Sequence, residues 1–94
     1  MSGAAAVLLG AYLHQDWQGE FGNADRAVAA IVAGEPLAIR QQAAAELRAL
    51  LDHDLSEADL ERQLNAVLCC EYRPQADGLT VRAWLSALAA HLDR

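Results

Sequence analysis

The apolar residues of this chain recur three and four positions apart, which is the spacing of one face of an α-helix. No segment shows the strict alternation expected of a β-strand, and the 94 residues include only six glycines and two prolines. The pattern therefore predicts an all-α fold, a single domain over residues 1–94 built as a bundle of about five short helices. An apolar fraction of 54% is sufficient for one modest core.

Boundary residues place the five helices along the chain. The first should run from about Gly3 to His14, and Gly19 and Gly22 should break the chain after it. Gly34 suits the C-terminal cap of the second helix, and residues 71–79 read as a loop. The remaining helices should begin at three N-caps and one first-turn proline, namely Asn23, Pro36, Ser56 and Thr80.

Two of these helix starts carry further signals. Ser56 followed by Asp59 resembles a capping box, and hydrophobic staples are expected from Leu55 with Leu60 and from Leu79 with Trp84.

Val67 should lie on the buried face of the fourth helix. One core is expected to contain Trp17, Leu47, Leu50, Leu64, Leu68, Trp84, Leu85 and Leu88.

The cysteines Cys69 and Cys70 are adjacent in the sequence. A disulfide between neighbours would need a strained ring, and no further Cys or His lies at zinc-ligand spacing. We therefore expect reduced, partly buried cysteines that are dispensable for function, with no metal and no cofactor. Two such thiols are typical of a reducing compartment.

The apolar run from Ala4 to Leu13 is ten residues long, whereas a transmembrane helix needs about 20. No Lys or Arg precedes this run, so it does not resemble a signal peptide. The chain is expected to act in the cytoplasm without a membrane partner.

The net charge of −6 is concentrated in one stretch, residues 52–61, which we call the acidic segment. It holds five acids and no Lys or Arg, while the other eight acids nearly balance the seven arginines. Lysine is absent and the arginines are scattered, which argues against a nucleic-acid partner. Its acidic members are Asp52, Asp54, Glu57, Asp59 and Glu61.

This acidic segment has two interpretations. Solvated surface is the commoner case, and Glu57 and Asp59 suit the N-terminal dipole of the fourth helix. Asp52 and Asp54 fall near the C-terminus of the third helix, where carboxylates are disfavoured. They could instead form an acidic surface that meets a basic partner, such as the phosphate-binding cleft of a nuclease.

The stretch from Tyr12 to Gly22 holds three of the five aromatic residues among polar ones. We favour a structural role for its aromatic side chains, with Trp17 folding back onto the bundle. His14, Gln15, Asp16 and Glu20 could contact a partner at the surface. An acid–base pair of His14 and Asp16 is the third, catalytic reading, and a Cys-His dyad with Cys69 or Cys70 has no support from spacing. The absence of a catalytic motif predicts that the protein is not an enzyme.

The string LGAYLHQDW over residues 9–17 resembles the GAYFHQDW signature of small immunity proteins of contact-dependent growth inhibition systems. LCCEYRP over residues 68–74 is similar to that family's LGCxYxP segment, with Cys69 where the family often has glycine. Asp77-Gly78 followed by Trp84-Leu85 resembles its closing helix. The likeness covers nearly the whole chain. The mainly structural motif residues would be Tyr12, His14, Gln15, Asp16 and Trp17.

The resemblance implies a CdiI-like cytoplasmic protein that binds the C-terminal toxin domain of a large secreted adhesin and blocks its active site. In such systems the toxin is often a nuclease, which suits the acidic segment. The candidate toxin-binding residues are Asp52, Asp54, Glu57, Asp59, Glu61, His14, Asp16 and Glu20. The alternative is a helical adaptor or regulatory module unrelated to toxins, and the oligomeric state stays open between a monomer and a weak dimer.

Overall fold

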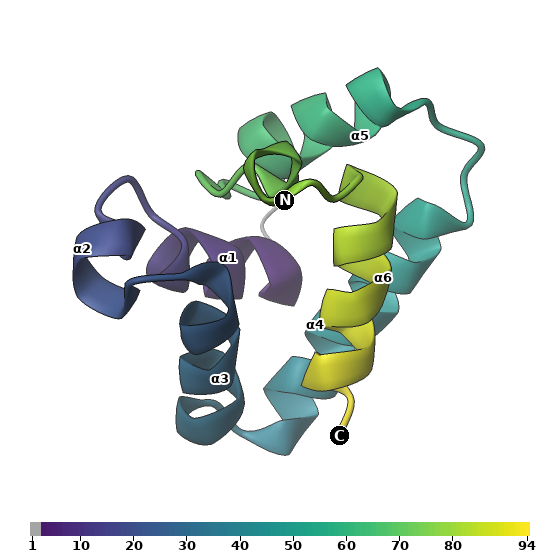
Figure 1. Cartoon of the computed structure of the whole chain (residues 1–94). Helices are drawn as coiled ribbons and strands as arrows, with labels where there is room; N and C mark the ends of the chain where they lie inside the picture. Colours follow the sequence, from purple (N-terminus) through teal and green to yellow (C-terminus); the bar gives the residue numbers. More distant parts are fainter. Residues whose placement is uncertain (1–2) are drawn as a thin grey trace.

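Helices make up the regular structure of residues 3–94, the part of the chain that this computed structural model describes (Figure 1). No strand occurs in that range, which confirms the predicted all-α class. A π-helical turn, η1, continues α5, and a short 3₁₀ turn, η2, lies before the last helix. The elements are α1 (Ala4–Tyr12), α2 (Trp17–Phe21), α3 (Ala24–Gly34), α4 (Leu37–Leu51), α5 (Glu57–Arg62), η1 (Gln63–Val67), η2 (Pro74–Asp77) and α6 (Val81–Leu92).

The core lies where α4 packs along α6 and α1 packs against α4 (Figure 1). Seven of the eight residues predicted for the core are buried in it, and Leu50 is only half-buried at its edge. The short helix α2 was not predicted, because Gly19, which lies within it, and Gly22, which caps it, indicated a break. It seats Trp17 in the core, as expected from the sequence.

The prediction for Val67 was wrong, since 54% of this residue is exposed. The cause is η1, in which the amide of Leu68 bonds the carbonyl of Gln63 at 2.9 Å, five residues back. A π-helical turn takes more residues than an α-helical turn, so it rotates the following side chains out of register. Leu64 and Leu68 therefore share the buried face, and Val67 points away from it.

The three predicted N-caps are confirmed. Side-chain oxygens of Asn23, Ser56 and Thr80 each accept a hydrogen bond from the amide three residues later, at 2.9–3.1 Å. The capping box at Ser56 is incomplete, because the Asp59 carboxylate bonds Arg62 instead.

Gly34 is the last residue of α3 rather than its cap, and the chain leaves the helix through an extended Glu35. A side chain at Gly34 would place its Cβ 3.0 Å from the Tyr12 hydroxyl oxygen. That hydroxyl donates to the Glu35 carboxylate at 2.8 Å, so glycine permits the close approach of Tyr12. The same hydrogen bond raises the pKa of the Tyr12 phenol above its usual value.

Charged side chains from distant helices satisfy several helix ends, and we call Glu46, Glu57, Arg40 and Arg82 the tertiary caps. Glu46 of α4 accepts from the amides of Ala4 and Ala5, at 3.0 and 2.9 Å, at the N-terminus of α1. Arg40, only 8% exposed, donates to the carbonyls of Leu92 and Arg94 at the C-terminal end of α6. Helix ends carry unpaired amides and carbonyls of opposite partial charge, so each cap has the favourable sign.

Cys69 has a φ of 56°, in the left-handed region that favours glycine. The amide of Cys70 bonds the carbonyl of Leu64 at 3.0 Å across it, closing the end of η1. This is a Schellman-type closure, widened by the π-helical turn. Both thiols are free, Cys69 exposed and Cys70 buried. Burial raises the pKa of the Cys70 thiol from 9.0 to about 12.

Among the helices of residues 3–94, none combines the length and the apolarity that crossing a membrane requires.

Candidate functional site

The acidic segment begins at the C-terminal end of α4 and continues through a linker into α5. Asp52 is the C-cap of α4, Asp54 lies in the linker, and Glu61 lies in α5; all three are exposed. None of these three carboxylates forms an ion pair within the described part of the chain. Asp59, by contrast, pairs with Arg62 one turn later.

Glu57 has an internal role as a tertiary cap. Its carboxylate accepts hydrogen bonds from the amides of Val81 at 2.7 Å and Arg82 at 3.0 Å, in the first turn of α6. This contact holds α5 against the start of α6. A toxin contact through Glu57 stays a prediction, and it would have to share the carboxylate with the fold.

Arg82 lies beneath the linker. Its guanidinium donates to the carbonyls of Leu51 at 3.0 Å and Leu55 at 3.1 Å. A positive charge at the C-terminus of α4 offsets the unfavourable position of Asp52 and Asp54 relative to the helix dipole. The linker is therefore held from within, and its two carboxylates remain at the surface.

The N-terminal aromatic block divides as expected between core and surface. The rings of Tyr12 and Phe21 stack with centroids 6.0 Å apart. Trp17 meets Tyr72 edge-on at 5.4 Å, and Tyr72 meets Trp84 at 5.0 Å. These edge-to-face pairs join the start of the chain to α6.

The Nε2 nitrogen of His14 forms a hydrogen bond of 2.7 Å with the carboxylate of Glu20 on the surface beside α2. The other ring nitrogen, His14 Nδ1, accepts from the backbone amide of Asp16 at 3.1 Å, so the Asp16 side chain is not its partner. This network ties the loop before α2 to that helix and leaves the carboxylate of Asp16 at the surface. Within residues 3–94, no group of three or more His, Cys, Asp or Glu side chains could hold a metal ion.

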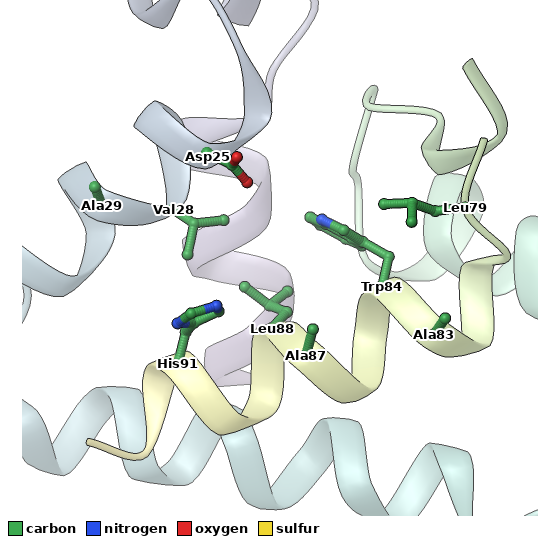
Figure 2. A pocket seen from close by; sticks show the side chains of 9 residues that line it. All are labelled: Asp25, Val28, Ala29, Leu79, Ala83, Trp84, Ala87, Leu88 and His91. Carbon is green, nitrogen blue, oxygen red and sulfur yellow. The ribbon is translucent and has the colours of Figure 1, made fainter. Parts of the chain in front are cut away.

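A groove between α3 and α6 was not anticipated from the sequence (Figure 2). Its volume is about 430 Å³, and Val28 of α3 faces Trp84 and Leu88 of α6 across it. The complete lining is Asp25, Val28, Ala29, Leu79, Ala83, Trp84, Ala87, Leu88 and His91. A second hollow of about 300 Å³ adjoins it, sharing Asp25, Leu79 and Trp84.

Leu79 and Trp84, the pair expected to form a hydrophobic staple, both line this groove. Leu79 is 42% exposed and Trp84 is buried, and a staple between them stays a prediction. Three of the residues that line the groove are alanines, at positions 29, 83 and 87. The small residues on these two helices are visible in the sequence. The residues around each of them do not show that the two helix faces meet in the fold.

Two carboxylates stand at the groove and the adjoining hollow. Asp77 accepts a hydrogen bond from the Tyr72 hydroxyl at 2.6 Å. Burial, together with this bond, raises the pKa of the Tyr72 phenol, which therefore stays a proton donor at neutral pH. Asp25 has no ion-pair partner among residues 3–94. The groove thus has an apolar floor with one carboxylate, Asp25, in its lining, the adjoining hollow adds Asp77, and His91 lines the groove two turns along α6 from Trp84.

Comparisons with known proteins give two findings. A family model described as CdiI immunity protein matches residues 4–92. A chain in the crystal structure of a CdiA-CT/CdiI complex from Y. kristensenii superposes with a TM-score of 0.87 and 31% sequence identity, covering 95% of each chain. A comparison with curated proteins gave no match.

Proposed function

Since the chain belongs to the CdiI immunity protein family, we propose that it binds and neutralises the cognate C-terminal toxin domain of a CdiA-type effector. The observation that carries the proposal is the match over nearly the whole chain, in sequence and in fold, to a CdiI family model and to a chain of a CdiA-CT/CdiI complex. CdiI immunity proteins are inhibitors, so the chain is not an enzyme. Family membership favours this function over that of an unrelated helical adaptor.

We further propose that the toxin is a nuclease and that the acidic segment covers its active site. Nuclease clefts bind phosphates and present basic side chains, to which exposed carboxylates are electrostatically complementary. Asp52, Asp54 and Glu61 support this interpretation, because they are exposed and unpaired within residues 3–94. The Arg82 guanidinium holds the linker that presents two of them.

We propose that the chain acts in the cytoplasm, because it would have to bind the toxin domain there. The two free thiols support a reducing compartment.

Binding kinetics test both parts of the proposal. The chain should bind its cognate toxin domain tightly, abolish the toxin's activity in solution and protect cells that express the toxin. Replacing both Asp52 and Asp54 by Asn should slow association and reduce its dependence on salt, while leaving dissociation nearly unchanged.

The control is Glu71→Gln, which removes an exposed acid outside the acidic segment. It should change the association rate far less. If the chain does not bind the toxin domain, the immunity function is refuted. If it binds but the double variant associates like the parent, only the role of the acidic segment fails.

A further inference from the structure

We propose that the groove between α3 and α6 is the anchor site for the toxin, and that it receives an arginine or lysine carried on an apolar segment of the toxin domain. This inference rests on the function proposed above and names the part of the partner that the chain recognises. None of the residues that line the groove belongs to the acidic segment.

The shape of the groove suits an inserted side chain. Its volume of about 430 Å³ lies within the range of sites that bury a ligand. Val28, Trp84 and Leu88 form an apolar floor that can cover the methylene stem of a long side chain. Interfaces draw most of their binding energy from a few such anchors in well-formed pockets.

The polar groups at the groove identify the charge of the occupant. The Asp25 carboxylate and the Trp84 indole point toward one another from α3 and α6 (Figure 2). Asp25 is exposed and has no ion-pair partner within residues 3–94, and Asp77 stands beside the adjoining hollow. An apolar floor below a carboxylate matches Arg and Lys, whose stems are apolar and whose ends are cationic.

The indole N–H of Trp84 offers a second contact. Within the described chain, every side-chain nitrogen or oxygen that is fully buried has a hydrogen-bond partner. The indole N–H of Trp84 has no partner there, so this atom is not fully buried and water reaches it. A donor of this kind suits a backbone carbonyl of the inserted segment. A peptide segment with a cationic side chain therefore satisfies both Asp25 and Trp84.

A second copy of this chain is a poorer occupant. Each copy carries a net charge of −6, so two copies repel one another. Four of the seven arginines are already engaged in hydrogen bonds within the chain: Arg40, Arg48, Arg62 and Arg82. A basic partner fits the groove, and an acidic one does not.

The test measures binding of the cognate toxin domain to groove variants. Asp25→Asn removes the charge and keeps the shape, and should raise Kd at least about tenfold. Ala87→Trp fills the groove from an exposed position of α6, and should raise Kd roughly thirtyfold or more, mainly through faster dissociation. The matched control is Ala49→Trp, an exposed alanine of α4 that lines neither hollow, and it should bind within about twofold of the parent.

Circular dichroism of each variant shows whether it is folded, and Asp25→Asn keeps the test valid should Ala87→Trp not fold. Alanine replacement of each Arg and Lys in the toxin domain then identifies the occupant. One such replacement should make Kd insensitive to Asp25→Asn, because the pair would already be broken. Sensitivity that persists through every replacement would overturn the cationic occupant.

Parent-like binding by both Asp25→Asn and a folded Ala87→Trp would overturn the groove as anchor while leaving the immunity function standing. A parent chain that does not bind the toxin domain would overturn both.

Discussion

Removing the carboxylate of Glu57 should destabilise the fold itself, whatever Glu57 contributes to toxin binding. The first turn of α6 has four amides to satisfy. The amide of Ala83 donates to the Thr80 hydroxyl, and that of Trp84 to the Thr80 carbonyl. Glu57 accepts from the other two, those of Val81 and Arg82, at 2.7 and 3.0 Å. Glu57→Ala therefore leaves two amides at the end of a core helix without their protein partner.

The magnitude follows from the kind of bond and its exposure. Hydrogen bonds to a charged group contribute about 1.5–3 kcal/mol when they are well buried. Glu57 is exposed, so water can replace much of each bond, and the loss should be close to that of an N-cap, about 1–2 kcal/mol. For a domain of this size, that corresponds to a fall in Tm of roughly 5–15 °C.

Urea and thermal unfolding of Glu57→Ala measure this loss, and Glu57→Gln should lose about half as much, because its amide oxygen can still accept one bond. The control is Glu61→Ala, an exposed acid of the same segment with no ion pair in the described chain; its unfolding free energy should stay within about 0.5 kcal/mol of the parent. If Glu57→Ala and Glu61→Ala unfold at the same midpoint, the capping argument is wrong.

Four further predictions concern the thiols and the core. Cys69→Gly should stabilise the protein by about 0.5–1 kcal/mol, seen as a higher urea midpoint, because glycine adopts the φ of 56° without strain; a lower midpoint would contradict this. Iodoacetamide should label the native protein once, at exposed Cys69, whereas mass spectrometry showing rapid labelling of Cys70 would refute its burial. Because the folded state raises the Cys70 pKa from 9.0 to about 12 and so holds its proton more tightly, stability should fall as pH rises through that range, and less steeply in Cys70→Ala. Trp84→Ala should cost roughly 3–5 kcal/mol, and a variant that melts like the parent would show that Trp84 is not a core residue.

The helix positions could be predicted because their signals are local. Asn23, Ser56 and Thr80 each act on an amide three residues away, and apolar spacing identified most of the core. The prediction for Val67 failed because a single π-helical turn changes the period without a recognisable residue pattern.

The tertiary caps and the groove could not be predicted, because both depend on how distant helices meet. Arg40 bonds carbonyls 52 and 54 residues away, and its sequence neighbours give no sign of it. Ala29 of α3 and Ala87 of α6 come to line one groove only after the two helices pack. The acidic segment was visible in the sequence as a charge cluster, but the use of Glu57 within the fold was not.

The tertiary caps also bear on how the molecule opens. The ends of α1, α4 and α6 are satisfied by side chains that lie 24 to 54 residues away in the sequence. No one of these helices can detach without leaving unpaired polar groups on another, and short helices are marginal in water on their own. The three should therefore form one cooperative unit, with their slowest-exchanging amides reporting a single, global opening free energy in native-state hydrogen exchange. Such a chain offers a protease few partly unfolded forms between the native and the unfolded states.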